Sequence, residues 1–376
     1  MKVVNVRSPF IVEVPSQGST HTGSYVILTV WNYDVSEPTI GEKGWYSFTK
    51  SNPSSTQKST YCNVSNYVKE FINNIKPSNY NLLYPLGEDV NEWCLFHVKS
   101  YWFNSSTSSY VEYSDNYYYG VNGFTNYTDG NQNPSTIKLQ LLANPNINNY
   151  YYKNSYSDLK MEYLNVMYDK LTTDTFSVKY ERIDGVVYSV IINILISTAG
   201  TDNLKVPITP IIYNGNFING CKVTITLTPA SGSPIVYIFY SYPIEECKYT
   251  PVRCSFINRY GGWKDIIFFK AQSNSVSVKG TDYKLTQDTT NYNTSIGQFK
   301  TFNLNGKQTV KLNTGFVDEN YSELITDLLL SETVLLDGKP VTVKTQGSDL
   351  KTSLKDRLIN YEMEFEYAYN LINDIV

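Results

Sequence analysis

The feature that most constrains the fold is a two-residue alternation of apolar and polar side chains. In residues 361–369, tyrosine, methionine or phenylalanine occupies every second position, and glutamate or alanine occupies the positions between them. Alternate side chains of a strand lie on opposite faces of its sheet. We therefore expect a strand here with one buried face, with Glu362, Glu364 and Glu366 on the side that faces water.

Glycine-containing turns separate further β-rich runs. Asp184-Gly185 lies between residues 176–180 and the run that begins at Val186, and it predicts a hairpin because glycine accepts the positive φ of a tight turn. Residues 222–228 and 235–240 form a second predicted hairpin. The sequence predicts two more hairpin turns, at Asn305-Gly306 and Asp337-Gly338.

Two segments have helical spacing. Ser65 can cap a helix over 66–75, in which apolar residues recur at intervals of three and four. Asp318 or Asn320 can begin a second helix, with one apolar stripe formed by Tyr321, Leu324, Ile325, Leu328 and Leu329. The expected fold class is mainly β, α+β overall, with β-sandwich or barrel-type domains and a few short helices.

The length of 376 residues predicts two or three domains. Residues 116–154 are crowded with Asn, Gly, Ser and Tyr, so we expect an inserted loop or hairpin that is poor in core residues and contacts a neighbouring subunit. A second boundary along the chain comes near Cys247. We therefore expect β-rich N-terminal structure over 1–248 and a C-terminal α+β domain over 249–376.

Composition disfavours several partners. The net charge of −4 argues against a dedicated binder of nucleic acid or of anionic membranes. The 34 tyrosines and 38 asparagines give a polar, weakly charged surface suited to subunit contacts, although AT-rich coding would give the same bias. The longest apolar run, 186–196, is too short for a membrane helix. We find no signal peptide and expect synthesis in a cytoplasm.

Cysteine and histidine offer little chemistry. The five cysteines are widely spaced without a CxxC pair, so we expect reduced thiols and neither a disulfide framework nor a zinc site. The two histidines, His21 and His97, are too few for a metal cluster and read as structural residues. On a strand, Cys94 and His97 would face opposite ways. We therefore expect no metal, no cofactor and no cysteine–histidine catalytic pair.

The acidic residues leave one enzymatic alternative open. A glycosidase needs only two carboxylates, and the densest acidic groups are Glu245-Glu246 and the three glutamates of 362–366. Solvated charges explain both groups more simply. No phosphate-binding loop, nucleophile elbow or zinc-protease motif occurs. The sequence therefore indicates a protein that is not an enzyme and has no catalytic residues.

Tyrosine-rich stretches are the best candidates for a binding surface. Tyrosine combines a flat apolar ring with a hydroxyl, which suits protein contacts and sugar stacking. A β-ribbon that covers its own domain is the plain structural alternative. The candidate interface residues are Tyr110, Tyr113, Tyr117, Tyr118, Tyr119, Tyr150, Tyr151 and Tyr152.

Residues 258–263 (Asn-Arg-Tyr-Gly-Gly-Trp) predict a turn that needs the conformational freedom of glycine and then places Trp263 in a core with Ile267 and Phe269. The expected turn and core residues are Gly261, Gly262, Trp263, Phe268 and Phe269.

The same run carries a resemblance. Residues 246–270, with ECKYTP, FINRYGG and FFK, resemble virion proteins of tailed phages that infect Bacteroidetes, especially the crAss-like group. The likeness continues through 312–317 and 360–370, about the last third of the chain. It implies a tail-hub or ring subunit that assembles with copies of itself and with other tail or neck proteins around a channel.

The expected function is therefore structural: a virion component of the tail or neck, with no sequence-specific nucleic-acid binding and no membrane partner. The alternative is a carbohydrate- or receptor-binding module of a tail fibre or adhesin, in which the tyrosine-rich loops bind a surface glycan. A glycosidase acting on that glycan is a third, weaker alternative.

Overall fold

Strands dominate the computed structural model, with 54% of the residues in strands and 6% in helices. The predicted mainly β, α+β fold with β-sandwich-type sheets is confirmed. The structure describes residues 1–376 apart from 33–34, 53, 55, 57–58, 74–92, 154–162, 171–173, 195–199, 208–216, 218, 245–247, 289, 292, 318, 348–358 and 374–376.

Internal contacts divide the chain into two compact units. The first unit holds residues 1–245 together with 257–264, and the second holds 246–256 and 265–376. The division near residue 245 lies close to the sequence-predicted boundary at 248/249. The short piece 257–264 belongs to the first unit although its neighbours in sequence belong to the second.

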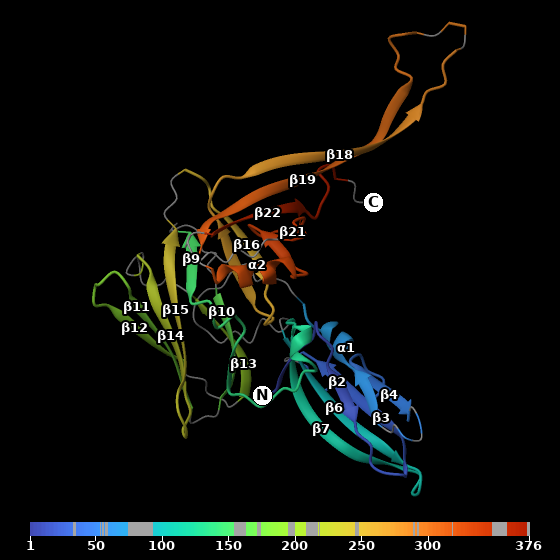
Figure 1. The fold of residues 1–376 in the computed structure, drawn as a ribbon, viewed down its shortest axis with the longest axis vertical. Coiled ribbons are helices and arrows are strands. Elements are labelled where there is room, and N and C mark those ends of the chain that lie inside the picture. Colours follow the sequence, from blue (N-terminus) through green and yellow to red (C-terminus); the bar gives the residue numbers. More distant parts are fainter. Residues whose placement is uncertain are drawn as a thin grey trace. The chain divides into compact units, whose positions relative to one another are not determined.

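The first unit begins with a five-stranded sheet, here called the N-terminal sheet, in the order β1-β7-β6-β3-β4 (Figure 1). Its strands are β1 (Val3–Asn5), β3 (His21–Trp31), β4 (Trp45–Ser51), β6 (Trp93–Asn104) and β7 (Ser109–Val121). One face of the sheet is apolar and buried, with Val26, Leu28, Phe96 and Val98 almost fully enclosed. The pair β2 (Ile11–Val14) and β5 (Thr60–Asn63) contributes to the same core.

Two further sheets of the first unit form a sandwich. A five-stranded sheet has the order β12-β11-β14-β15-β9, and a three-stranded sheet has the order β13-β10-β8. Side chains from both sheets form one buried cluster. The strands are β8 (Leu139–Leu141), β9 (Asn149–Lys153), β10 (Tyr163–Lys170), β11 (Thr175–Arg182), β12 (Ser189–Ile194), β13 (Gly200–Pro207), β14 (Cys221–Thr228) and β15 (Ile235–Ile244).

The second unit is built on a seven-stranded sheet in the order β17-β16-β20-β21-β22-β19-β18. The helix α2 (Tyr321–Leu329) buries Leu324, Ile325 and Leu328. The strands are β16 (Val252–Ile257), β17 (Trp263–Phe268), β18 (Ser273–Lys284), β19 (Phe299–Val317), β20 (Val334–Leu336), β21 (Lys339–Val343) and β22 (Ile359–Tyr367).

The alternation near the C-terminus gives the strand that it predicts. In β22, Tyr361, Met363 and Phe365 are buried, while Glu362 and Glu364 are exposed. The hairpins at 184–185 and 337–338 and the pairing of β14 with β15 are also confirmed.

The turn predicted at Asn305-Gly306 is wrong. Both residues lie inside β19, which pairs continuously with β18 across this point apart from one bulge. The positive φ of this region falls on Asn303, at 51°, beside that bulge. An Asn-Gly pair marks a hairpin only where the chain reverses, and here it accompanies an irregularity within a long strand.

The two helices differ in how well sequence spacing describes them. The second begins after Asn320 as expected. The first, α1 (Ser65–Lys69), is shorter than the predicted 66–75 and starts at Ser65 itself. Val64 is the N-cap and makes no side-chain cap bond, so the cap expected at Ser65 is wrong; the Asn63 side chain accepts hydrogen bonds from the Ser65 backbone and hydroxyl in a turn just before the helix. Residues 74 and 75 lie outside the described residues.

Residues 116–154 are not a detached insertion. They complete β7, pass through a single 3-10 turn (Tyr127–Asp129), and then supply β8 and β9 to the two sandwich sheets. Leu139, Leu141 and Tyr150 are part of the sandwich core. Three-residue and five-residue strands need few apolar positions, so a segment rich in asparagine can still contribute core.

Candidate functional site

The outer face of the N-terminal sheet is lined by aromatic rings. Residues opposite one another in the β3, β6 and β7 register share a face, and the odd-numbered residues of β3 and β6 point away from the core. A bulge at residue 113 of β7 brings Tyr110 and Tyr117 onto this same outer side. We call these residues the aromatic face: Tyr25, Trp31, Tyr101, Phe103, Tyr110 and Tyr117.

The rings of the aromatic face support one another. Tyr110 lies with its ring centroid 5.1 Å from that of Phe103 and 5.5 Å from that of Tyr25. Trp31 and Tyr117 make an edge-on contact at 6.4 Å. Because Tyr110 and Tyr117 remain about half exposed, the face is a fixed aromatic surface open to solvent on this unit.

His97 lies at the centre of a charge network on this face. Its ring is 3% exposed and stacks on Tyr117, with centroids 3.8 Å apart. Nδ1 lies 2.6 Å from Glu37 Oε1, and Nε2 contacts Asp115 Oδ1. Each ring nitrogen of His97 thus faces a carboxylate oxygen, which accepts hydrogen bonds when ionised. Lys99 pairs with Asp115 at 3.6 Å.

The network holds both carboxyl groups in the ionised state. The hydrogen bond from His97 is the main cause that lowers the pKa of Asp115, with help from Lys99. Burial opposes ionisation of Glu37, but bonds from His97 and Thr29 outweigh it and lower the pKa of this carboxyl. Burial and the charge of Glu37 raise the pKa of Tyr117. The carboxylates are thus occupied by partners rather than poised for proton transfer, which fits the structural role expected for His97.

The structure separates the sequence-predicted tyrosines into two groups. In the first, Tyr110, Tyr113 and Tyr117 are exposed on β7. Tyr118 points to the opposite side, where its ring stacks on Phe96 with centroids 5.1 Å apart. Tyr119 packs at 5.6 Å from Trp93, against a small buried cluster.

The second group lies on β9, in the sandwich. Tyr150 is 1% exposed and makes an edge contact with Phe239, so the expectation that it forms an interface is wrong: it fills the core. Tyr151 lies 6.1 Å from Tyr242 on the neighbouring strand. The side chain of Tyr152 is outside the described residues. The eight tyrosines therefore do not form one surface.

The glycine-rich turn between β16 and β17 is buried. Gly261 has φ of 85°, which disfavours any larger side chain. A Cβ on Gly262 would meet the backbone oxygen of Leu142 at 2.2 Å. Asn258 fixes the loop, because its side chain donates to that same oxygen and accepts from the Gly262 backbone. Trp263 follows with 8% exposure.

The two phenylalanines after this turn differ in burial. Phe268 is 1% exposed and makes an edge contact with Phe365 of β22, at 5.7 Å. Phe269 is half-buried, and its ring lies where a side chain on Gly315 would have to go.

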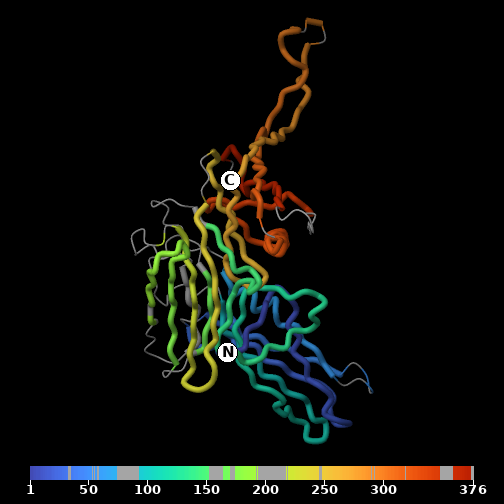
Figure 2. Tube along the Cα trace, turned by 60° about the vertical axis from the view of Figure 1, so that its left-hand side comes forward, coloured from blue at the N-terminus to red at the C-terminus, as the bar shows by residue number. Residues whose placement is uncertain are grey.

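A long two-stranded ribbon is the most exposed part of the second unit. We call residues 273–306 the arm: it consists of β18, the connection after it and the first part of β19. β22 pairs with β19 only from Thr309 onward, and Leu371 and Ile372 bond to Gly306 and Asn305 at the base of the arm. Beyond that base, the arm strands pair with each other (Figures 1 and 2). Every side chain of β18 is exposed. The arm is thus a β-hairpin without a core of its own.

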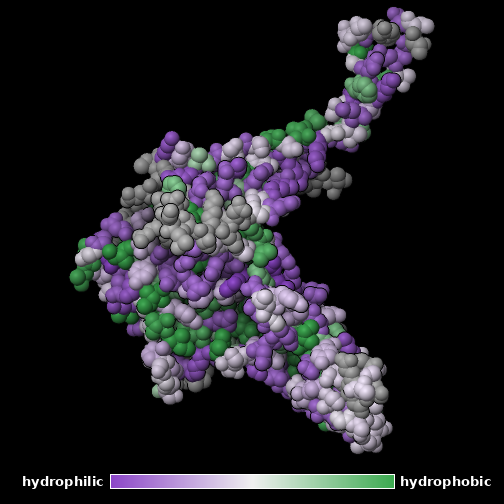
Figure 3. All heavy atoms as spheres, viewed as in Figure 1, coloured by the Kyte–Doolittle hydropathy of each residue, from purple (hydrophilic) through white to green (hydrophobic). Residues whose placement is uncertain are grey.

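The arm nevertheless carries apolar side chains, which alternate with polar ones along its length (Figure 3). Tyr283 and Phe302 touch at 5.6 Å, yet both are more than 40% exposed. The other exposed apolar residues of the arm are Val276, Val278, Ile296, Phe299 and Leu304. Isolated two-stranded ribbons are marginally stable in water, and these side chains add exposed apolar area to such a ribbon.

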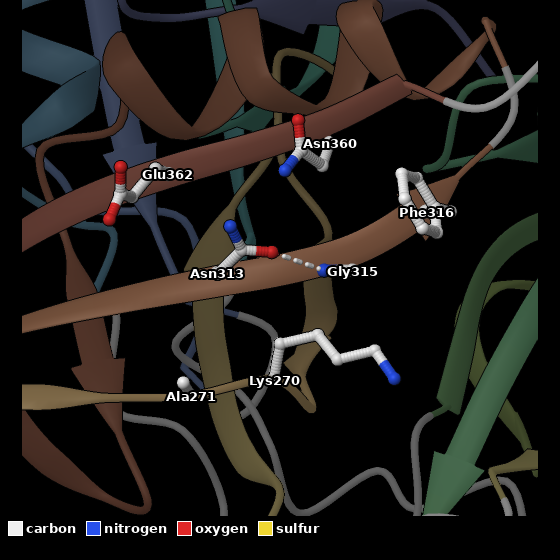
Figure 4. A pocket seen from close by; sticks show the side chains of 7 residues that line it. All are labelled: Lys270, Ala271, Asn313, Gly315, Phe316, Asn360 and Glu362. Atoms are coloured by element: carbon white, nitrogen blue, oxygen red, sulfur yellow. Dashed lines mark hydrogen bonds between the residues drawn. The ribbon is translucent and has the colours of Figure 1, made fainter.

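A shallow pocket of about 300 Å³ lies where β19 and β22 meet (Figure 4). Asn313 accepts a hydrogen bond from the Gly315 backbone at its floor, and Phe316 is 60% exposed at its rim. The pocket is lined by Lys270, Ala271, Asn313, Gly315, Phe316, Asn360 and Glu362. Except for Ala271, these residues belong to the segments that carry the resemblance to virion proteins.

The clustered acids are paired with lysines. Glu362 binds Lys311 at 3.0 Å, and Glu366 lies within 3.3 Å of both Lys307 and Lys344. The bond from Lys344 is the largest cause that lowers the pKa of Glu366. Glu245-Glu246 lies outside the described residues. Glu362 and Glu366 thus act as partners in surface ion pairs.

The cysteines that the structure describes are all buried. Cys62, Cys94, Cys221 and Cys254 are buried free thiols, and burial raises the pKa of Cys94 far above its usual value. Among the described residues, no group of three or more His, Cys, Asp or Glu side chains could hold a metal ion. In that same part of the chain, neither helix has the length and apolar character needed to cross a bilayer.

Comparison with models of known protein families gives no match, and comparison with curated proteins gives none either.

Sequence reasoning missed two features. The arm escaped because the Asn305-Gly306 pair suggested a turn where β19 in fact continues. The His97 network escaped because Glu37, His97 and Asp115 are separated by 60 and 18 positions. Alternation in β6 places His97 outside, but only the register with β7 shows that Asp115 lies beside it.

Proposed function

We propose that the chain is a structural subunit of a tailed-phage virion, a tail-hub or neck-ring component that joins copies of itself in a closed ring. The observation that carries the proposal is the arm. A ribbon that exposes seven large apolar side chains gains stability only when another surface covers them. The resemblance of the last third of the chain to virion proteins is the reason for proposing a tailed-phage virion as the assembly.

The chemistry of the candidate sites agrees with a structural role. Glu37 and Asp115 are occupied by His97, and Glu362 and Glu366 by lysines. These groups stabilise local structure rather than leave a base or nucleophile open to a substrate. We therefore propose no catalytic role for these four carboxylates.

Particle mass tests this proposal. The purified full-length chain, measured by mass photometry over a range of concentrations, should form one discrete multiple of the 42.9 kDa subunit. Electron microscopy should show closed rings, and antibodies against the chain should label the tail or neck of the phage. A chain that stays monomeric and is missing from purified particles would refute the proposal.

One observation favours a second candidate, a glycan-binding module. The aromatic face offers exposed tyrosine rings for stacking on sugar, and Glu112 lies on the same side, where its carboxylate could accept hydroxyl hydrogen bonds. Binding to a glycan array that is lost in Tyr117→Ala would support this candidate. Ring-shaped oligomers that bind no glycan would support the structural candidate.

A further inference from the structure

We propose that the pocket where β19 and β22 meet binds one pyranose ring of a neutral sugar. Three of its side chains form the site: Asn313 and Phe316 of β19 and Asn360 of β22 (Figure 4). All three lie in the second unit. Binding here is separate from the subunit contacts of the proposed function and from the aromatic face of the first unit.

A bulge in β19 brings the three side chains to one side of the sheet. Asn313 lies opposite Glu362 and Phe316 lies opposite Asn360, so the register shifts between the two pairs. Residues that lie opposite one another in a sheet share a face. In a regular strand, positions three apart would face opposite ways. The bulge therefore places an aromatic ring beside two amide groups on the same outer face.

The residues around the bulge fix its geometry. Gly315 has φ of 71°, and a Cβ there would lie 2.6 Å from the Phe269 ring, so this position requires glycine. Thr314 is buried, where its hydroxyl accepts a hydrogen bond from the Tyr361 backbone at 3.0 Å and donates to the Gly315 carbonyl at 2.8 Å. Bulges often re-aim side chains beside active sites. The aim of Phe316 is thus set by the backbone.

The amide groups of the pocket are available to a ligand. Asn360 is exposed, and its amide makes no hydrogen bond to any described residue. Asn313 accepts a bond from the Gly315 backbone through Oδ1 at 2.7 Å, but its Nδ2 has no partner within the described ranges. An amide side chain offers both donors and an acceptor. Neighbouring hydroxyls of a sugar ring, which also donate and accept, match this pair.

Phe316 supplies the flat surface that a sugar ring needs. Its side chain is 60% exposed at the rim of the pocket. The face of an aromatic ring is electron-rich, so it attracts the C–H groups on one side of a pyranose, which carry partial positive charge. Stacking on Phe316 and hydroxyl bonds to the two amides use opposite properties of the same small ligand.

Charge and size favour a single neutral ring. Lys270 and Glu362 both line the pocket with opposite charges, and Glu362 already pairs with Lys311 at 3.0 Å. An ion would therefore gain little here. The volume of about 300 Å³ is at the lower end of the range for ligand pockets, which fits one sugar ring better than an oligosaccharide or a peptide.

Saturation-transfer nuclear magnetic resonance on the full-length protein tests this site. The probes are the methyl glycosides of glucose, galactose and N-acetylglucosamine. At least one of them should receive saturation from the protein, with a dissociation constant on the order of 1 mM, as expected for so small a ligand. Tetrahydropyran has the same ring without hydroxyls and should receive none.

Two variants remove the two kinds of contact. Phe316→Ala deletes the stacking surface, and Asn360→Leu replaces the amide by an apolar group of similar size. Each should weaken glycoside binding by about tenfold or more. Phe299→Ala, at a phenylalanine of the arm that is 64% exposed, and Tyr117→Ala on the aromatic face are the controls and should bind like the wild type. Circular dichroism should show the same unfolding midpoint for all four variants.

The outcomes separate this site from the proposed function. No transfer to any of the three glycosides at about 20 mM would overturn the sugar site, and so would equal transfer to tetrahydropyran, which would indicate an apolar cavity alone. Binding that persists in both Phe316→Ala and Asn360→Leu would place the sugar elsewhere and overturn it as well. In each case the proposed function stands, because it depends on particle mass. A monomer that binds a glycoside through Phe316 would refute the proposed function and support the site.

Discussion

Two hairpins that follow one another in sequence have opposite surroundings. In β16–β17, every residue of β17 is buried, and the turn is held by Asn258 and by glycines with no room for a side chain. In β18–β19, every residue of β18 is exposed. The strands of each hairpin are hydrogen-bonded neighbours, but only the first hairpin is buried.

The comparison separates two uses of the same local structure. Backbone pairing alone leaves a ribbon marginally stable, and burial of apolar area supplies the rest. For β16–β17 that burial is provided within the chain. For the arm, the proposed function implies that another molecule provides this burial. Substitutions should therefore affect folding in the first hairpin and assembly in the second.

The largest expected effect on folding is at Trp263. Replacement by alanine should cost about 3–5 kcal/mol of unfolding free energy, because it empties a buried aromatic site. Chemical denaturation of the full chain measures this cost. Phe299→Ala on the arm is the matched control and should leave the unfolding free energy nearly unchanged. A small cost at Trp263 would remove the contrast between the hairpins.

Gly262→Ala should cost about 2–3 kcal/mol, since its Cβ would collide with a backbone oxygen that cannot move independently. Gly338→Ala is a useful comparison, because that glycine has φ of 81° but open space around it. Its cost should be only about 1–2 kcal/mol, the price of the left-handed conformation. Equal costs at the two positions, in the same denaturation experiment, would argue against close packing at Gly262.

His97→Gln should cost about 1–2 kcal/mol, because it removes the ring stack on Tyr117 and at least one bond to a carboxylate. The partner carboxylates are partly exposed, which keeps the effect modest. Nuclear magnetic resonance of the Tyr117 ring should show that it loses its fixed position. An unchanged Tyr117 environment would mean that the network does not order the aromatic face.

The same network predicts a pH dependence. The pKa values of Glu37 and Asp115 are lowered in the folded chain, so these groups stabilise it above their ordinary values near pH 4 and lose that contribution as pH falls through the lowered values. Thermal unfolding between pH 7 and pH 2.5 should show the loss. The His97→Gln variant should lose less over this range, and identical pH profiles would rule the network out as the cause.

The smallest effect on folding is expected at Tyr283, an exposed residue near the end of β18 on the arm. Tyr283→Ser should change the unfolding free energy by less than about 0.5 kcal/mol, as expected for an exposed position. Its effect should appear in association, where sedimentation should show weaker particles. A variant that unfolds more easily but assembles normally would reverse the roles assigned to the two hairpins.

The sequence predicted the strands whose environment is regular. β22 and the β20–β21 hairpin follow from alternation and turn residues because one face is wet and the turn is short. Residues 116–154 were misread because strands of three to five residues leave almost no periodic signal. α1 ends at Lys69 although apolar spacing continues, because the Phe71 and Ile72 N–H groups bond to carbonyls three residues back, as in turns, instead of four.

The candidate site was less predictable. Tyr110 and Tyr117 share a face only because a bulge resets the alternation of β7, and no sequence pattern marks that bulge. In sequence, Tyr150 cannot be distinguished from the tyrosines beside it on β9, but in the structure a second sheet encloses it. Exposure of the arm depends on where β22 stops pairing, which is a long-range property of the fold.

Single-particle mass of the full-length chain tests the central claim most directly, when the wild type is compared with the Tyr283→Ser variant under identical conditions. The expected result is one closed oligomer for the wild type and a larger share of 42.9 kDa subunits for the variant at the same concentration. Oligomers of equal mass and equal stability from both proteins would contradict it.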